Sequence, residues 1–378
     1  MKQKWWILLT LLLCGCGASS QPDQTGAVQN DRPRLSASTE ETAENVAEVE
    51  KNENLEKNPS NSNQNPGEGQ NWTVFAMDTV MQFDAYGGSA NLQEKVKRRV
   101  EELEGELSTT QENSDIFHLN QEKTAELSAD TRYLMQEALA LGAETDGALD
   151  ISIYPIVRSW GFTTGNYRVP SENERESLLK SVDYRLVGLE ADTASIEPGM
   201  MVDLGGVGKG FTGDEVVKAM KEDGVTSALF SLGGNIQTIG TKPDGEKWYV
   251  GIKDPESDGY LGGVGVQDEA VITSGGYERY FTDNDGTIYW HIMDPSTGTP
   301  AHSGLISVTI IGPCGLRCDG LSTALFVMGR EKAAAHWAAH QDYEAVLVDE
   351  GGTIWLTPGL KDRFIPVDQG ETREIRIL

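Results

Sequence analysis

The sequence is organised around one glycine-rich segment, Val202-Asp203-Leu204-Gly205-Gly206-Val207-Gly208-Lys209-Gly210-Phe211, which a mixed apolar and charged run follows at 214–220. The pattern predicts an extended entry, a glycine turn and then the start of a helix. At such a turn the free backbone N–H groups and the helix dipole point toward a ligand, so the segment is a candidate anion site. A tight backbone corner without a ligand is the alternative interpretation.

The segment is not a P-loop. A P-loop has Ser or Thr directly after its Gly-Lys pair and a further glycine at a fixed distance before it. In this chain Gly210 and Asp203 stand at those two positions. The glycines therefore indicate that the backbone comes close to a ligand. They do not indicate that this ligand is a nucleoside triphosphate.

Two further glycine turns are expected in the same domain. Ser231–Asn235 follows an apolar run, and Thr273–Arg279 adds two hydroxyls and a cation to a glycine pair. Each turn alone would be an ordinary corner. Together with residues 202–211 they indicate a ligand that carries several oxygens and that the backbone approaches closely.

Two more positions are candidates for chemistry. His291, at the end of a strand-like run, could act as an acid, a base or a phosphate contact, with a hydrogen-bonded turn histidine as the alternative. Asp319 and Thr323 are spaced to share one face of a helix that is expected to begin there. A carboxylate and a hydroxyl with few other ligands suit Mg²⁺, whereas a helix N-cap is the alternative role for Asp319.

Strand-like runs outnumber helix-like runs and come in pairs, which predicts an α+β fold with mixed or antiparallel sheets and covering helices. Helices are expected at residues 92–107, 131–144, 171–179 and 320–339. Strands are expected at residues 72–77, 81–86, 228–231, 247–252, 264–266, 288–293, 306–311, 345–348 and 353–356. Ser171 and Glu174 have the spacing of a capping box at the third of these helices.

The composition excludes simple binding to a nucleic-acid backbone. The 378 residues include 31 Lys or Arg and 59 Asp or Glu, a net charge of −28, so no basic excess exists to displace counterions. The acidity favours solubility. Two of the 4 cysteines lie within the first 16 residues, so no disulfide framework is expected. Cys314 and Cys318 lack the partners of a structural zinc site and are expected to be buried thiols.

The N-terminal residues have the pattern of an export signal. Lys2 and Lys4 precede an apolar run at 5–13 that is shorter than the ~20 residues needed to span a bilayer. The run ends in Leu13-Cys14-Gly15-Cys16, which resembles a bacterial lipobox and implies that Cys16 becomes a lipid-modified N-terminus. A plain secretory signal is the alternative.

The chain is therefore expected to have three parts: a lipoprotein signal peptide at 1–16, a tether at 17–71 and a folded domain at 72–378. The tether contains no Phe, Trp or Tyr and is dominated by polar residues, so it cannot bury enough apolar surface to fold. Anchor and tether predict a lipid-anchored protein on the extracytoplasmic face of the cell membrane.

Short blocks follow one another in order from Trp72 to the last strands. They are Met77–Met81, Gly147–Ser152, Pro155–Phe162, the DLGGVGKG of 203–210, the LGGN of 232–235, the TSGGYERYF of 273–281, the HIMDPSTG of 291–298 and the DGLSTALFVMG of 319–329. No single block is specific. Together and collinear they resemble the ApbE family, the FAD:protein FMN transferases, whose usual work is extracytoplasmic.

The resemblance implies a duplicated α+β arrangement similar to a T-fold, with FAD as substrate and Mg²⁺ as cofactor. It assigns FAD binding to Met77, Ser108, Thr109, Thr110, Ala148, Leu149, Asp150, Asp203, Lys209, His291 and Ile292. It assigns Mg²⁺ to Asp319, Thr323 and the backbone carbonyl of Gly206. The metal would bridge the diphosphate of the dinucleotide.

The implied reaction moves the FMN part of FAD onto a Thr or Ser hydroxyl of a partner flavoprotein and releases AMP. Such an attack on phosphorus depends on alignment and charge neutralisation more than on a covalent enzyme step. Mg²⁺, held by Asp319, and Lys209 would stabilise negative charge, and His291 would assist the acceptor hydroxyl. Hydrolysis of FAD to FMN and AMP by the same metal centre is one alternative. A lipoprotein that binds FAD without catalysis is the other.

Three positions depart from the family pattern. Asp78 replaces the usual Gly of the opening block, Gly208 stands where Ala is common, and Gly276 replaces a frequent Asp. Gly208 is expected to make its loop more pliable. Gly276 removes a possible carboxylate near the ribose or phosphate of FAD, so the sequence does not predict how tightly FAD binds.

Overall fold

The computed structural model describes residues 69–367 and 373–378, which belong to one unit, Glu56–Leu378. The expected signal peptide, Cys16 and nearly all of the expected tether lie outside the described residues. Within the described ranges, no helix has both the length and the apolar character needed to cross a membrane.

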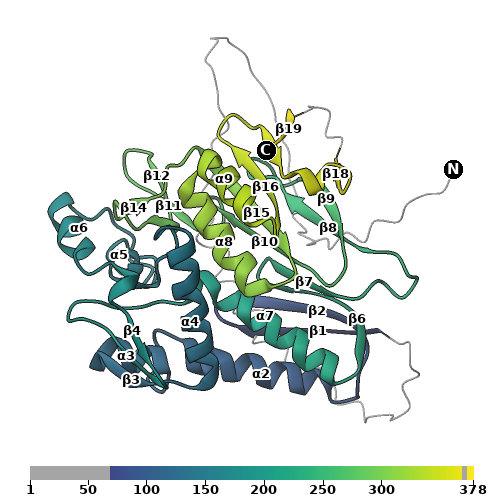
Figure 1. Cartoon of the computed structure of the whole chain (residues 1–378), viewed down its shortest axis with the longest axis horizontal. Helices are drawn as coiled ribbons and strands as arrows, with labels where there is room; N and C mark the ends of the chain where they lie inside the picture. Colours follow the sequence, from purple (N-terminus) through teal and green to yellow (C-terminus); the bar gives the residue numbers. More distant parts are fainter. Residues whose placement is uncertain (1–68, 368–372) are drawn as a thin grey trace, which may run out of the picture. The chain divides into compact units, whose positions relative to one another are not determined.

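A nine-stranded sheet forms the centre of the fold, in the order β1-β2-β6-β7-β10-β15-β16-β17-β19 (Figure 1). The pairs are antiparallel except for the parallel pair β17 and β19. The strands are β1 (Gly69–Ala76), β2 (Thr79–Gly87), β6 (Val225–Leu232), β7 (Asn235–Ile239), β10 (Ala270–Gly275), β15 (Leu305–Gly312), β16 (Glu344–Asp349), β17 (Ile354–Leu356) and β19 (Ile375–Ile377). The expected α+β class with mixed or antiparallel sheets is confirmed.

Helices cover one face of this sheet and a second sheet covers the other. The helices α2 (Leu92–Leu107), α7 (Gly205–Glu222) and α8 (Gly315–Met328) pack on the first face, as Figure 1 shows. The three-stranded sheet of β8 (Trp248–Lys253), β9 (Tyr260–Val266) and β18 (Phe364–Pro366) packs on the opposite face. Successive strand residues point to opposite faces. Accordingly Ile272 enters the core under the helices, whereas its neighbour Val271 enters the core under the small sheet.

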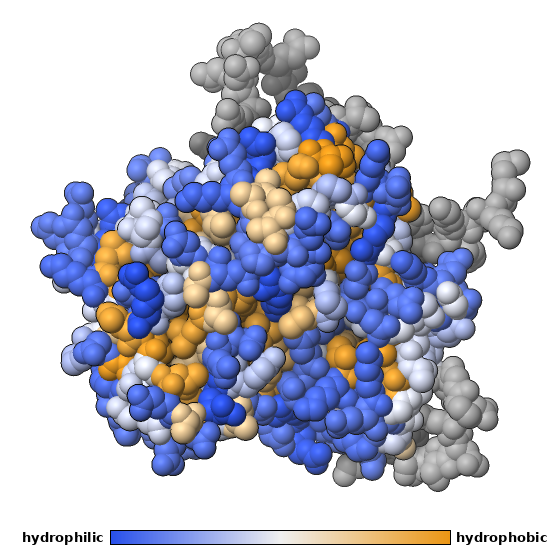
Figure 2. Space-filling model, viewed as in Figure 1, coloured by the Kyte–Doolittle hydropathy of each residue, from blue (hydrophilic) through white to orange (hydrophobic). Residues whose placement is uncertain are grey.

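The amphipathic spacing read from the sequence is confirmed for α2. Its apolar residues Leu92, Val96, Val100, Leu103 and Leu107 are all buried. The opposite face is charged and open to solvent. In the view of Figure 2, hydrophilic residues cover most of the helical side of the protein, as the net charge of −28 requires.

The remaining elements are shorter or lie at the rim of the sheet. The helices are α3 (Asp115–Glu122), α4 (Ala129–Glu144), α5 (Tyr154–Ser159), α6 (Glu172–Leu179) and α9 (Arg330–His340), with single 3₁₀ turns at Ile151–Ile153, Tyr184–Leu186 and Pro358–Leu360. The strands are β3 (Thr124–Glu126), β4 (Gly188–Glu190), β5 (Thr193–Ser195), β11 (Tyr280–Thr282), β12 (Ile288–Trp290), β13 (Met293–Asp294) and β14 (Thr299–Pro300). At α6 the Ser171 side chain accepts the Glu174 N–H, which confirms the N-cap half of the expected capping box, while the Glu174 carboxylate pairs with Arg168.

Two expected boundaries are wrong. The helix expected at 320–339 is two helices, α8 and α9, because Gly329 adopts a φ of 78° between them. It also begins earlier, since the carboxylate of Asp214 accepts the N–H groups of Gly315 and Leu316 over 2.7 and 2.8 Å and so caps α8. Asp319 therefore lies inside the helix and is not its N-cap. The strand expected at 288–293 is two short strands, β12 and β13, that pair with different partners.

The glycine-rich segment also differs from expectation. It is not a turn before a helix, because α7 begins at Gly205 and the glycines form its first two turns. The fold itself starts at Gly69, slightly before the expected Trp72. Of the two expected thiols, Cys318 is buried while Cys314 is half-buried, and both are free.

Candidate active site at the junction of α7 and α8

The start of α7 packs closely on the first turns of α8. The Gly210 N–H donates to Asp319 Oδ2 over 2.8 Å. A Cβ at Gly210 would lie 2.3 Å from the carbonyl oxygen of Gly315, so only glycine allows this approach. In an α-helix the carbonyl of Gly206 points at the same Gly210 N–H. The Gly206 carbonyl and the Asp319 carboxylate, which the sequence assigns to one metal, therefore lie at one junction.

Asp319 is a buried carboxylate, with an exposed fraction of 5%. Burial raises its pKa above the usual range, while the positive charge of Lys209, the Gly210 N–H and the Asn235 amide oppose that rise. The Asn235 Nδ2 atom is buried and has no hydrogen bond of good geometry to any residue in the described ranges. The Nδ2–H group of Asn235 could donate to an oxygen of a bound ligand, whereas a cation would bind the Asp319 carboxylate.

Hydroxyl groups connect α8 with β10 next to this carboxylate. Ser274 Oγ lies 2.8 Å from Ser322 Oγ and 3.2 Å from Thr323 Oγ1. Thr323 follows Asp319 by one helical turn and is half-buried, so both side chains lie on one face of α8. The carboxylate and the hydroxyl predicted for the metal thus share one face of α8, and their role as metal ligands stays a prediction.

Lys209 is the cation of this site. Burial raises the pKa of each of three neighbouring carboxyl groups, and the Lys209 ammonium opposes that rise at Asp203, Glu278 and Asp319. None of the ion pairs formed between described residues includes Lys209. A cation that is surrounded by acids yet paired with none is available to an anionic ligand.

His291 follows β12 and faces the same cation. Its backbone N–H and its Nδ1 atom lie 3.1 and 3.2 Å from the carbonyl oxygen of Arg279. Burial, together with the charges of Lys209 and Arg279, lowers the pKa of His291 to about 4, against the weaker effect of the Arg279 carbonyl. The imidazole is therefore neutral at pH 7. With the proton on Nδ1 donated to Arg279, Nε2 keeps a lone pair that can accept a proton.

The segment Ala148–Asp150 lies against the start of α7. The Asp203 N–H donates to the Ile151 carbonyl over 2.8 Å, and Leu149 approaches the Gly206 Cα. The carboxylate of Asp150 is engaged locally, because it accepts the N–H groups of Ser152 and Tyr184 over 2.8 and 3.0 Å. Ile292 is buried in the core under the helices, as Leu149 is. The roles of these residues toward FAD stay predictions.

Met77 lies in the turn between β1 and β2, beside α7. Its N–H donates to Glu104 Oε1 over 2.7 Å, and the Thr212 hydroxyl lies 3.6 Å from its sulfur. Ser108, Thr109 and Thr110 follow the end of α2, where the Ser108 hydroxyl accepts the Thr110 N–H over 3.1 Å. The hydrogen bonds of Ser108 and Thr110 are local, so the part of these residues in FAD binding also stays a prediction.

Known proteins resemble this chain over most of its length. The sequence profile of the ApbE family matches residues 77–347. This chain belongs to the ApbE family. An FAD:protein FMN transferase of Klebsiella pneumoniae is 30% identical over 79% of this chain and 95% of its own length. Another from Vibrio cholerae is 33% identical over 67% of this chain and 78% of its own length.

Solved structures of the ApbE family share the fold. The ApbE protein of Thermotoga maritima superposes with a TM-score of 0.74 at 32% identity, over 78% of this chain and 99% of that one. The flavin transferase ApbE of Vibrio cholerae superposes with a TM-score of 0.72 at 28% identity, over 79% of this chain and 100% of that one.

Two residues near Lys209 and Asp319, Glu278 and Asn235, were not singled out by the sequence, which marked two hydroxyls and the Arg279 cation in the third glycine turn. Glu278 and Arg279 lie in the loop after β10, and Asn235 begins β7. Burial raises the pKa of Glu278 to about 7, and Asp319 raises it further while Lys209 and Lys253 oppose the rise. Asn235 belongs to the second glycine turn, Ser231–Asn235, and Glu278 to the third, Thr273–Arg279, so these turns were the signal that could have found both residues.

The departures from the ApbE pattern have structural counterparts. Asp78 takes a φ of 57° in the tight turn after Met77, a conformation that glycine adopts more easily. Gly208 lies within α7 with open space where a Cβ would be, so no pliable loop exists there. A Cβ at Gly276 would lie 3.0 Å from the Trp290 ring, so Trp290 occupies the space that a larger residue would need.

Residues 208–213 also read G-x-G-x-x-G, the spacing of dinucleotide-binding turns. In those turns the glycines connect a strand to a helix. In this protein all of them lie inside α7. The dinucleotide-binding motif therefore does not apply, and an ApbE site has to be built from the α7–α8 junction.

Proposed function

We propose that this protein transfers the FMN part of FAD to a Thr or Ser hydroxyl of a partner flavoprotein and releases AMP. The observation that carries the proposal is the contact of Gly210 with Asp319, which places a carboxylate, a helix carbonyl and the unpaired Lys209 at one junction. The junction accounts for the blocks that the chain shares with FAD:protein FMN transferases.

The residues present fit a hard divalent cation. Asp319, the Gly206 carbonyl and Thr323 offer only oxygen atoms as ligands, which suits such an ion. These three would hold Mg²⁺. When bound, the ion would neutralise charge on the diphosphate of FAD and on the leaving phosphate of AMP.

The chain's own residues supply alignment and proton transfer. Lys209, free of ion pairs within the described part of the chain, would hold diphosphate oxygens. His291 Nε2 would accept the proton of the acceptor hydroxyl, whose oxygen bonds to the phosphorus of FMN as the bond to the AMP phosphate breaks. Arg279, through its carbonyl, keeps the imidazole in the tautomer that can accept this proton.

The test combines the full chain with FAD, Mg²⁺ and a candidate acceptor flavoprotein domain. Transfer gives a fluorescent acceptor band on a denaturing gel and one AMP per flavin attached. Free FMN with AMP would instead indicate the hydrolase, and unchanged FAD would indicate a protein that only binds flavin. We expect His291→Ala to abolish labelling while FAD still binds, and full labelling by this variant would refute the role of His291.

We further propose that the protein works on the extracytoplasmic face of the cell membrane, anchored through a lipid on Cys16. The proposal rests on the basic and apolar N-terminal residues and on the cysteine at the end of the apolar run. Cells producing the full chain should incorporate labelled palmitate into it, and Cys16→Ser should remove the label. Equal labelling of the variant would contradict the anchor.

A further inference from the structure

A second cluster of metal-binding side chains lies at the C-terminal end of α4. Glu144 is the last residue of α4, and His336 and His340 lie one turn apart on α9. One ligand atom from each of the three lies within 4.8 Å of the others. None of these residues belongs to the α7–α8 junction or to the proposed transfer reaction.

The two imidazoles face the same carboxylate oxygen. His336 Nε2 lies 3.0 Å from Glu144 Oε1, and His340 Nε2 lies 3.5 Å from it. The two rings stack with centroids 4.2 Å apart. The His336 side chain is 3% exposed, and its Nε2 atom makes no well-formed hydrogen bond within the described residues despite its approach to Glu144.

The other ring nitrogen of each histidine is already held. His340 Nδ1 lies 2.9 Å from the His336 carbonyl oxygen, and His336 Nδ1 lies 2.9 Å from the hydroxyl of Tyr343. The carbonyl can only accept, so His340 carries its proton on Nδ1 and leaves Nε2 free, while the Tyr343 hydroxyl can donate to His336 Nδ1 or accept from it. Metal-bound histidines have such a partner at the ring nitrogen that does not bind the metal. The His340 Nε2 lone pair then points at the Glu144 carboxylate, and the two repel each other unless a proton or a cation lies between them. When the Tyr343 hydroxyl donates to His336 Nδ1, His336 Nε2 carries the proton of that ring, and when it accepts, His336 Nε2 offers a second lone pair to the ion.

We propose that Glu144, His336 and His340 bind a transition metal of the Zn²⁺ class, separate from the oxygen site at Asp319. Two imidazoles and one carboxylate with a fourth position for water form a common zinc donor set. His340 is exposed, so water and the ion can reach that position. The ion would join the end of α4 to α9.

The charged neighbours allow this ion but limit its affinity. Arg317 donates to Glu144 Oε2 and Oε1 over 2.9 and 2.7 Å, which orients the carboxylate while placing a positive charge beside it. Asp342 lies 2.7 Å from Arg317 and offsets that charge. Burial and the neighbouring His340 lower the pKa of His336, so it is neutral and able to bind a metal at pH 7.

Zn²⁺ titration of the full chain against a chromogenic chelator tests the proposal. Excess Mg²⁺ in the buffer occupies oxygen sites, because Mg²⁺ competes poorly for imidazole. We expect His340→Ala to bind one equivalent of Zn²⁺ fewer than the wild type. His340 is exposed, so the variant should fold, and loss of the thermal stabilisation by Zn²⁺ gives a second readout.

The matched control is His118→Ala. His118 and Glu122 form a similar pair on α3, 3.3 Å apart and one turn apart, but without a third ligand. This variant should bind as much Zn²⁺ as the wild type, and so should Asp319→Asn. Equal Zn²⁺ binding by His340→Ala and the wild type would overturn the proposal. The short distances between the histidines and Glu144 would then be explained by a proton shared between them.

Discussion

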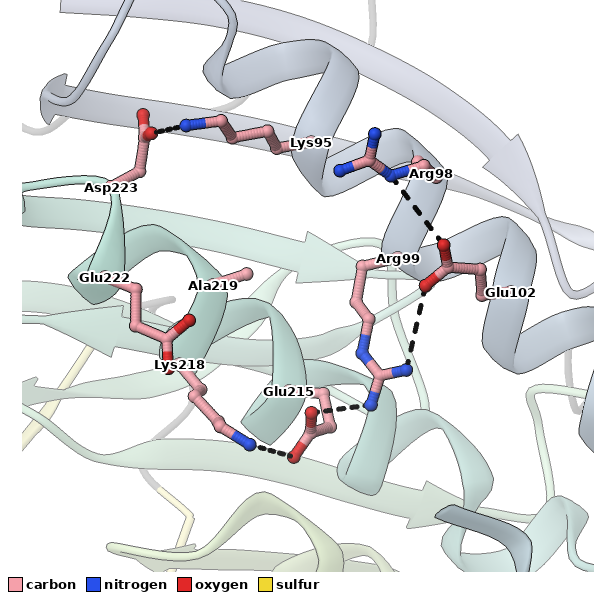
Figure 3. Close-up of a pocket in the computed structure, with 9 residues that line it drawn as sticks. All are labelled: Lys95, Arg98, Arg99, Glu102, Glu215, Lys218, Ala219, Glu222 and Asp223. Carbon is pink, nitrogen blue, oxygen red and sulfur yellow. Dashed lines mark hydrogen bonds and ion pairs between the residues drawn. The ribbon is translucent and has the colours of Figure 1, made fainter. Parts of the chain in front are cut away.

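The two ends of α7 differ in whether their charged residues are paired. At the first turns, Lys209 pairs with no acid in the described ranges, and burial raises the pKa values of Asp203 and Asp319. At the last turns, charged residues of α2 and α7 line a groove and are joined to one another (Figure 3). Burial of Asp223 there is outweighed by its contacts with Lys95 and Ser89, so its pKa is lowered.

The groove is held together by mutual pairing. Arg99 lies 2.6 Å from Glu215, and Lys95 forms an ion pair with Asp223 (Figure 3). Arg99 also lies 2.6 Å from Asp130 of α4. Charges that satisfy one another stabilise the fold and leave little for a ligand. Charges that remain unpaired beside buried acids are available for chemistry. The groove is therefore a weaker candidate for a ligand site than the start of α7, because its charged residues are mostly paired with one another.

The largest expected effect is that of Asp319→Asn. The variant keeps the size of the side chain but loses the charge that a divalent cation requires, so FMN transfer should fall by about 100- to 1,000-fold. Flavin fluorescence of the acceptor band measures it. A variant with near-normal labelling would mean that the site lies elsewhere.

Lys209→Met should lower the transfer rate by about 100-fold, because it removes the charge aimed at the diphosphate. Lys95→Met, at the other end of α7 and already paired with Asp223, is the matched control and should leave the rate unchanged. Initial rates of AMP release at saturating acceptor compare the two. A similar loss of transfer rate in both variants would show that Lys209 has no special role compared with the paired Lys95.

Two glycines of α7 should respond oppositely to alanine. Gly210→Ala forces a methyl group toward the Gly315 carbonyl, so it should destabilise the fold by about 1–3 kcal/mol and impair transfer. Gly208→Ala meets open space within a helix and should stabilise the fold by about 0.5–1 kcal/mol. Denaturant unfolding of both variants measures the difference. Destabilisation by Gly208→Ala would contradict the helical start of α7.

The smallest expected effect is on the pH dependence of FAD binding. Because the pKa of Glu278 is raised to about 7, this group is neutral below pH 7 and gains a negative charge above it. That charge repels the diphosphate, so KM for FAD should rise a few-fold from pH 6 to pH 8 in the wild type, but not in Glu278→Gln. The same rise in both would show that Glu278 does not titrate beside the substrate.

The fold could be predicted where local spacing sets it. The buried stripe of α2 and the paired strands are periodic in the sequence, and the structure confirms both. The start of α8 could not be predicted, because its cap is Asp214 from a distant segment. The helical state of Gly205–Gly210 was also missed, since glycine propensity favours a turn and only the packing against α8 favours a helix.

The site could be predicted in part for the same reason. Asp319, Gly206 and Lys209 belong to blocks with a recognisable pattern, and the fold brings them together. Glu278 and Asn235 lie in glycine turns that the sequence marks, but they come close to Asp319 only because α8 packs on β10 and its neighbours. Long-range packing of this kind leaves no trace in local sequence.

The most direct test of the α7–α8 junction is the Mg²⁺ dependence of FAD binding, measured by titration calorimetry on the wild type and Asp319→Asn. We predict that Mg²⁺ strengthens FAD binding to the wild type at least about tenfold, or ~1.4 kcal/mol, and leaves binding to the variant unchanged. An equal gain from Mg²⁺ in both proteins would contradict the assignment of the metal to Asp319.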